Sequence, residues 1–207
     1  PTGLVANPGD LYWVRITVLN RRIIERLSGV LARACDERHL IDLERVSFRL
    51  ATASDAVRGT WQREATYRGI LSHAAAESEL RLAFLSPTAF RRGQGYATLP
   101  EPALCLSSYL RRWNSFAVPA DRIDDEAVLA YARNWIKVAE SKLSPKGIWL
   151  GDFGAPGQIG EVIWCCVQDA PIVRQINALV DYAFFCRTGI KTSMGMGQTR
   201  RGNIRAD

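Results

Sequence analysis

The sequence lacks several features that define whole classes of protein. Its 207 residues contain no apolar run near the roughly 20 residues of a membrane span, and the start at Pro1 has neither the basic residues nor the apolar core of a secretory signal. Hydrophobic residues make up 47% and charged residues 23% of the chain, a balance that excludes a disordered polymer. We therefore expect a folded cytoplasmic protein of one or two domains, with no membrane partner.

Patterns for metal binding and disulfide formation are also missing. The only histidines, His39 and His73, form no HxxxH pair, so no metal and no cofactor are expected. The cysteines are odd in number and contain no CxxC spacing, which favours buried thiols over a disulfide framework. These cysteines are Cys35, Cys105, Cys165, Cys166 and Cys186.

Acidic residues are absent from one long basic segment near the C-terminus. The formal net charge is +6, and no Asp or Glu occurs between Arg187 and Arg205. A basic excess of this kind favours a polyanionic partner. The alternative interpretation is a basic, partly disordered tail.

The first part of the chain predicts a strand, a helix and a second strand. Residues 11–19 are rich in β-branched and aromatic side chains, and residues 43–50 alternate apolar and polar ones. Between them, Asn20 is a suitable N-cap for a helix in which apolar residues of 23–34 recur at helical spacing. A short connecting helix is expected within 61–76.

From Leu80 onward the predicted elements alternate in a different way. They are a strand from Leu80 to Pro87, helices over 102–116 and 124–133, a strand within 135–143, an antiparallel hairpin of 148–153 and 159–168, a helix starting at Asp169 and Pro171 and ending at Gly189, and a final strand.

This order indicates an α+β protein with tandem ferredoxin-like (RRM-like) βαββαβ domains. The second domain is expected over 80–207. The first, over 1–79, supplies only the second half of the plan and is incomplete. A start at Pro1 is expected of a processed or truncated chain, or of one module of a longer fusion.

The most specific segment is the glycine-rich run GIKTSMGMGQ from Gly189 to Gln198. Glycines permit positive φ angles and let a phosphate or another backbone approach the main chain closely. The run is not GxxxxGK[ST], and it follows a helix where a dinucleotide-binding fingerprint follows a strand. Both nucleotide-cofactor interpretations are therefore disfavoured.

Together with three earlier stretches, this run resembles the CRISPR-associated endoribonucleases that cut CRISPR repeat transcripts, within the wider RAMP superfamily. The supporting stretches are YWVRIT at Tyr12–Thr17, FLSPTAFR at Phe84–Arg91 and GQIGEV at Gly157–Val162. The resemblance implies two ferredoxin-like domains that hold CRISPR repeat RNA against a basic cleft and the glycine-rich loop. It further implies metal-independent cutting of precursor RNA within repeats by 2′-hydroxyl attack, to give guide RNAs.

The resemblance also directs the choice of site residues. The general-base histidine of the family commonly lies on the first helix of the first domain, and we expect it upstream of Pro1. His73 is the weaker catalytic candidate within the chain, whereas His39 is interpreted as a helix-end histidine. The residues expected to contact RNA are Arg91, Arg92, Arg187, Gly189, Lys191, Thr192, Gly195, Gly197 and Arg200.

Two groups of side chains are interpreted as structural. Arg111 and Arg112 are expected on the solvated face of a helix. Core packing is favoured over base stacking for the tryptophans Trp61, Trp113, Trp135 and Trp149. The alternative functions are a non-catalytic RNA-binding or scaffolding subunit, with other CRISPR effector or adaptation subunits as partners, and a module of a larger CRISPR fusion protein.

Overall fold

The chain forms two compact units, residues 1–64 and 65–207. The computed structural model describes residues 7–43, 46–53, 63–150, 153–167 and 171–202. The break lies upstream of the expected boundary between residues 79 and 80, because helix α2 (Tyr67–His73) packs on the second unit. The Tyr67 ring lies 5.0 Å from that of Trp113 in an edge-to-face arrangement, and its hydroxyl lies 3.4 Å from that of Tyr182.

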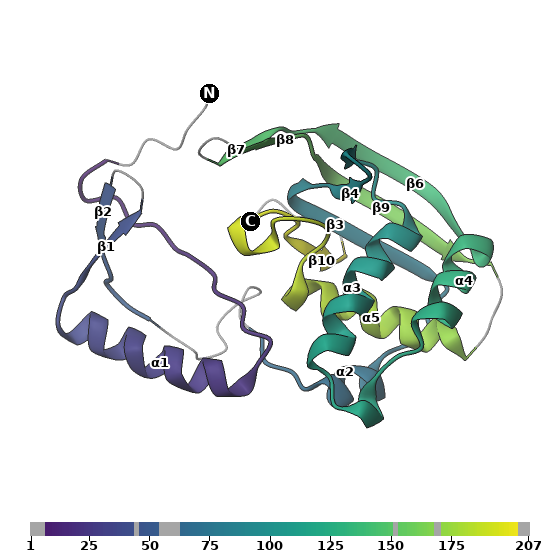
Figure 1. Ribbon diagram of the computed structural model, residues 1–207, viewed down its shortest axis with the longest axis horizontal. Coiled ribbons are helices and arrows are strands. Elements are labelled where there is room, and N and C mark those ends of the chain that lie inside the picture. The colour runs from purple at the N-terminus through teal and green to yellow at the C-terminus, as the bar shows by residue number, and fades with distance from the viewer. Residues whose placement is uncertain (1–6, 44–45, 54–62, 151–152, 168–170, 203–207) are drawn as a thin grey trace. The chain divides into compact units, whose positions relative to one another are not determined.

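In its described residues, 7–43, 46–53 and 63–64, the first unit contains one helix and one hairpin (Figure 1). Helix α1 (Arg21–Asp36) follows the expected N-cap, with the Asn20 side chain accepting from the Arg22 amide at 2.9 Å. Strands β1 (Leu40–Leu43) and β2 (Val46–Arg49) pair antiparallel. The expected strand over 43–50 is thus only the second arm of a hairpin. That this unit is the second half of a ferredoxin-like domain stays a prediction.

The expected strand over 11–19 is wrong. These residues have no regular secondary structure, and large apolar side chains among them, Trp13 and Val14, are 70% and 74% exposed. β-branched and aromatic composition reports how well side chains fit a pleated, half-buried surface, and it forms no strand without a neighbouring backbone to pair with.

The second unit confirms the ferredoxin-like plan. Its four-stranded antiparallel sheet has the order β10-β3-β9-β6, with α3, α4 and α5 packed against it (Figure 1). In chain order the sheet strands and main helices are β3 (Glu79–Thr88), α3 (Pro102–Phe116), α4 (Asp125–Trp135), β6 (Ile136–Pro145), β9 (Gln158–Cys166), α5 (Ile172–Cys186) and β10 (Thr199–Arg201). Shorter elements connect them, namely β4 (Phe90–Arg92), β5 (Gly95–Ala97), η1 (Pro119–Asp121), β7 (Ile148–Leu150), β8 (Phe153–Ala155) and η2 (Thr192–Met194).

The hairpin expected from 148–153 and 159–168 pairs differently. β9 pairs with the long strand β6, and β7 pairs with β8 as a separate small hairpin. The glycine and proline residues at 154–157 mark the passage from β8 into β9 rather than a hairpin tip. There a Cβ atom at Gly157 would lie 2.9 Å from Pro87 Cβ, so close packing against β3 requires glycine.

The core lies between the sheet and the helices. β3 contributes Leu80, Leu82 and Phe84, all fully buried, and Trp113 of α3 is also 0% exposed. The core interpretation is therefore confirmed for Trp113. It is wrong for Trp135 and Trp149, which are 44% and 77% exposed. The described residues leave out Pro1, Trp61, Asp169 and Arg205, as well as the last position of the segment expected over 159–168.

Within the part of the chain that the structure describes, no helix combines the length and the apolar character needed to cross a bilayer.

Candidate nucleic-acid interface

The glycine-rich loop between α5 and β10 has a buried side and an open side. Gly189 (φ +80°) and Gly197 (φ +69°) are buried, and Cβ atoms there would lie 2.1 Å from the Ala89 carbonyl oxygen and 1.8 Å from that of Thr188. These glycines let the protein's own backbone approach. Gly195 (φ +96°) faces open space. Gly195 is therefore the one of these three glycines that is exposed, and RNA contact by each of the three stays a prediction.

The Ser-Pro-Thr-Ala stretch at the end of β3 anchors this loop. The Ser86 hydroxyl donates to the Gly195 carbonyl at 2.8 Å and accepts from the Gln198 amide at 2.8 Å. The Ala89 carbonyl accepts from the Ile190 amide at 2.9 Å. Two motifs that are far apart in the sequence therefore pack together, and their backbone contacts fix the shape of the loop.

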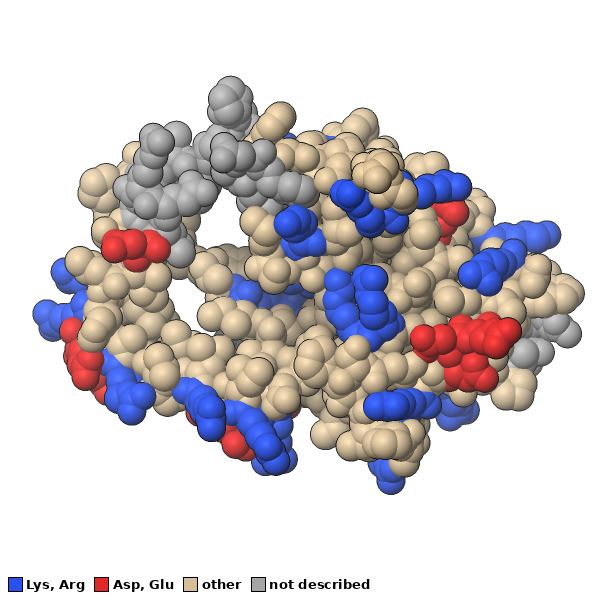
Figure 2. Space-filling model, in the orientation of Figure 1, with Lys and Arg blue, Asp and Glu red and all other residues tan. Residues whose placement is uncertain are grey.

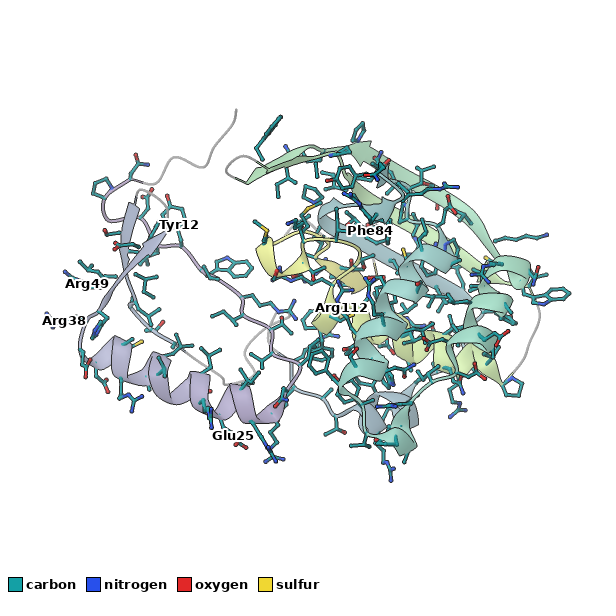
Figure 3. The ribbon with its side chains drawn as sticks, viewed as in Figure 1. Tyr12, Glu25, Arg38, Arg49, Phe84 and Arg112 are labelled. Carbon is teal, nitrogen blue, oxygen red and sulfur yellow. The ribbon has the colours of Figure 1, made fainter. Side chains whose placement is uncertain are left out.

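Helix α3 holds the loop through Arg112 (Figure 3). Its Nη2 donates to the Gly189 carbonyl at 2.8 Å and to Thr192 Oγ1 at 3.1 Å, while Nη1 donates to Ser108 O at 2.9 Å and Ser108 Oγ at 2.6 Å. The Ser108 hydroxyl in turn accepts from the Gly189 amide at 3.0 Å. The solvated-face interpretation is therefore wrong for Arg112, which is half-buried, although Arg111 is exposed as expected.

A buried chain of hydroxyl groups ties both ends of the loop to α3. The Tyr109 hydroxyl lies 2.7 Å from Thr188 Oγ1, which lies 2.7 Å from Thr199 Oγ1, and the last group donates to the Gly197 carbonyl at 2.9 Å. All three side chains are fully buried. Burial raises the pKa of Tyr109 well above its usual value, so this phenol stays protonated and able to donate.

Of the predicted cations at the loop, Arg187 is half-buried and Lys191 is exposed. Arg187 is half-buried, its Nη1 donates to the Thr192 carbonyl at 2.8 Å, and burial lowers its pKa. Its backbone, at φ 62° and ψ 179°, occupies a region that is almost confined to glycine, so its contacts must offset the strain. Lys191 (φ 49°) is exposed at the start of η2. Arg187 therefore supports the loop, and Lys191 lies exposed at its surface.

The β4–β5 hairpin presents two further predicted cations. Arg91 and Arg92 are exposed. The Arg91 Nε donates to the Gly93 carbonyl at 3.2 Å, and its guanidinium lies 5.6 Å from the centroid of the Tyr96 ring. Stacking over the ring holds the guanidinium in one orientation while its remaining N–H groups stay accessible to a phosphate.

A small hydrophobic cluster joins this hairpin, the β7–β8 hairpin and the glycine-rich loop. Ala89, Ala155 and Met196 form its buried centre. The half-buried residues packed around them are Tyr96, Ile148 and Ile190. The cluster keeps the exposed parts of three segments at one end of the domain. We call the exposed residues Arg91, Arg92, Lys191 and Gly195 the loop surface.

Arg200 lies away from the helices, on the open face of the sheet. It is opposite Ala83 in the β10–β3 register, and the same row continues to Glu161 and Lys142. These strands therefore alternate charges of both signs, unlike the aromatic sheet faces that stack RNA bases. Basic side chains form separate groups over this unit in Figure 2, and a large acidic group lies where Figure 1 draws α4. RNA contact by Arg200 stays a prediction.

His73 ends helix α2 and is exposed. Its Nδ1 lies 2.8 Å from the Gly69 carbonyl and 3.2 Å from Ser72 Oγ, so this nitrogen is engaged by its own helix. These hydrogen bonds lie within α2, and the catalytic role of His73 stays a prediction.

The loop, its anchor and the sheet all fall within one family match. The model of the CRISPR-associated endoribonuclease Cas6 family matches residues 82–199, more than half of the chain. The chain belongs to the Cas6 family. The match runs from β3 to β10 and so covers both the Ser-Pro-Thr-Ala anchor and the glycine-rich loop.

Individual Cas6 proteins show the same similarity. The CRISPR-associated endoribonuclease Cas6 of Mycobacterium tuberculosis is 26% identical over 122 residues, which are 59% of this chain and 38% of that protein. A Cas6 (TTHA0078) product complex superposes with a TM-score of 0.75 at 25% identity, covering 87% of this chain and 73% of the other. A substrate mimic complex of the same Cas6 gives 0.70 at 26%, covering 88% and 76%. The chain spans 38% of the length of the curated Mycobacterium tuberculosis relative, which is well under half.

Proposed function

We propose that this chain binds CRISPR repeat RNA at the loop surface and takes part in the cutting of precursor RNA within repeats, to give guide RNAs. The observation that carries the proposal is the glycine-rich loop, which is held by hydrogen bonds from Ser86 and Arg112 and exposes Lys191 and Gly195. A small hydrophobic cluster joins this loop to the hairpin that carries the exposed Arg91 and Arg92. Its Cas6 relatives include a product complex and a substrate mimic complex.

The chemistry that we propose needs no metal. A general base takes the proton of the ribose 2′-hydroxyl as its oxygen attacks the neighbouring phosphorus. The bond from phosphorus to the 5′-oxygen breaks, and a proton is given to that leaving oxygen, so no net proton is gained or lost. The products are a 2′,3′-cyclic phosphate and a 5′-hydroxyl. The ammonium of Lys191 would stabilise the charge that develops on the phosphate oxygens, and a fixed loop would hold the RNA for in-line attack.

A single gel tests both halves of the proposal. The purified chain is incubated with end-labelled repeat RNA in EDTA, and binding and cleavage are resolved separately. We expect saturable binding and one cut that leaves a cyclic phosphate. An RNA of scrambled sequence that binds equally tightly, or cleavage that appears only when Mg²⁺ is added, would contradict the corresponding half.

The loop surface is tested by exchanging one cation at a time. Lys191→Ala should weaken binding and reduce the slope of log affinity against log salt by about 0.7, the value for one lost contact to a single-stranded phosphate. Arg174→Ala is the matched control. Arg174 is exposed on the first turn of α5, about 18 Å along the axis from the end of that helix at Cys186. Equal slopes for the two variants would refute the assignment.

His73 is tested in the same assay. If His73 is the general base, His73→Ala will bind RNA with unchanged affinity and lose cleavage. Unchanged cleavage by His73→Ala would remove this residue from the mechanism.

A second candidate function is RNA binding without cutting, as a subunit of a CRISPR effector or a module of a larger fusion. One observation favours it. The charged side chains of the loop surface are Arg91, Arg92 and Lys191, all cations that bind phosphate and none a natural general base at neutral pH. Tight binding without cleavage in EDTA and in Mg²⁺ would select this function. In either case we propose a cytoplasmic protein, since all five cysteines are free thiols, as expected in a reducing compartment.

A further inference from the structure

The β7–β8 hairpin holds a tryptophan ring in an unusual setting. Trp149 is 77% exposed, although tryptophan has the largest apolar surface of any side chain. Its neighbour Ile148 faces the opposite way, into the small cluster with Ala155 and Met196. Because successive strand residues point to opposite faces, the anchored Ile148 fixes the outward direction of Trp149.

The residue opposite Trp149 lets the ring lie flat. Gly154 is its register partner on β8. A Cβ atom at Gly154 would lie 2.6 Å from Trp149 Cζ3 and 2.9 Å from both Cε3 and Cη2, so the six-membered ring covers the position where any other residue would carry a side chain. One ring face therefore rests on backbone, in the manner of an aromatic side chain that covers a strand glycine, and the other faces outward.

An open hollow of about 390 Å³ lies at this ring. It is lined by Gly147, Ile148, Trp149, Gly154, Ala155 and Pro156. This size is at the small end of the range of about 300–1,000 Å³ seen for small-molecule sites, and its lining provides backbone and apolar surface without a charged side chain. The exposed ammonium of Lys146 comes directly before it in the sequence. A planar apolar group joined to an anion suits this setting.

We propose that Trp149 stacks on an unpaired base of the RNA whose phosphates contact the loop surface. This inference rests on the proposed function. The cluster of Ala89, Ala155 and Met196 connects the hairpin of Trp149 to the glycine-rich loop, so one RNA strand can contact both. Every base has a π-face, which makes such a contact tolerant of sequence and suited to a position outside a paired stem.

The test compares four variants by RNA affinity and by salt slope. Trp149→Ala should weaken binding of single-stranded repeat RNA by about 5- to 160-fold, the range for one lost base stack. Trp149→Phe should keep most of the affinity, and Trp149→Leu, which retains apolar area without a π-face, should not. The salt slope should stay at the wild-type value in all three, since no phosphate contact is removed. Trp135→Ala, at a partly exposed tryptophan that ends α4, is the matched control.

An abasic scan of the RNA then identifies the stacked position. One abasic substitution should weaken binding to the wild-type chain and have no effect on Trp149→Ala. Equal affinity of Trp149→Ala and wild type, or equal affinity of the Phe and Leu variants, would overturn the stacking proposal while leaving the proposed function intact. A wild-type chain that does not bind repeat RNA would overturn the proposed function itself, and this inference with it.

Discussion

Replacing Arg112 by alanine should destabilise the second unit through the glycine-rich loop. The change removes hydrogen bonds to Gly189 O (2.8 Å) and Thr192 Oγ1 (3.1 Å) in the loop, as well as two bonds to Ser108. Gly189 is buried, and an unsatisfied buried acceptor costs about 1–3 kcal/mol. Water can reach the half-buried Thr192 and replace part of what Arg112 provides. We therefore expect a total loss of about 2 kcal/mol in the free energy of unfolding.

Thermal unfolding measures this loss. For a chain of this size, 2 kcal/mol corresponds to a fall in Tm of about 4–8 °C. Arg111→Ala is the matched control: it removes the same side chain one position earlier on α3, where the arginine is exposed, and should change stability by less than about 0.5 kcal/mol. Arg112→Lys should recover little, because an ammonium cannot reproduce the planar fork of a guanidinium.

Hydrogen exchange separates a local effect from a general one. In Arg112→Ala the rate of amide exchange should rise above its wild-type value more for residues 187–198 than for strand β3, because only the loop loses an anchor. The reasoning would be refuted if Arg112→Ala and Arg111→Ala had the same Tm, or if exchange rose uniformly over the second unit.

Three further perturbations address the same region. Gly197→Ala places a Cβ 1.8 Å from the Thr188 carbonyl oxygen and should lower the free energy of unfolding by on the order of 4 kcal/mol or more. Gly195→Ala meets open space and should lower it only by the ~1–2 kcal/mol that a left-handed backbone costs. Thermal unfolding compares the two variants. Tyr109→Phe leaves a buried hydroxyl of Thr188 with one partner fewer and should cost about 1 kcal/mol by urea denaturation. Burial raises the pKa of Cys186 from 9.0 to about 12, so the folded state favours the neutral thiol. The contribution of this thiol to stability should therefore be constant below pH 9 and fall as the pH rises toward 12, so the wild-type chain should lose more stability over this range than Cys186→Ser. Equal falls in urea midpoint from pH 8 to pH 11 for the two chains would contradict this.

The sequence predicted secondary structure and fold best where the apolar pattern of a segment and its place in the order of elements agree. The order of elements from Leu80 predicted the ferredoxin-like sheet, and the periodic apolar residues of α5 predicted a helix over nearly its full length. The same methods failed at residues 11–19, where strand-like composition has no pairing partner, and in the β7–β8 hairpin. Pairing between strands depends on contacts across the chain, which no local pattern records.

The candidate site was chosen from its glycines, and the structure shows that two of them, Gly189 and Gly197, lie against the protein's own carbonyl groups. Sequence spacing shows that glycine is present, and it does not show whether a ligand or the protein's own carbonyl occupies the space beside it. Arg112 was missed for a related reason. Ser108 and Arg112 are four residues apart and so share one face of α3, a signal that was available, yet the contact with Gly189 joins segments nearly eighty positions apart. Trp149 was assigned to the core because apolar neighbours surround it in sequence, whereas its strand partner is a glycine.

Under the proposed function, residues that hold the loop in place and residues that contact RNA form two sets that affinity measurements can separate. Arg112, Gly197 and the Ser86 hydroxyl hold the backbone in place before any ligand arrives, so RNA binding need not order the loop. Variants of these residues should weaken binding by adding an ordering cost, and the number of phosphate contacts in the final complex should be unchanged. Variants of Lys191 should instead lower both affinity and salt slope. An Arg112→Ala chain with a wild-type salt slope and reduced affinity would show that the loop is preorganised, whereas a reduced slope would show that this guanidinium itself contacts phosphate.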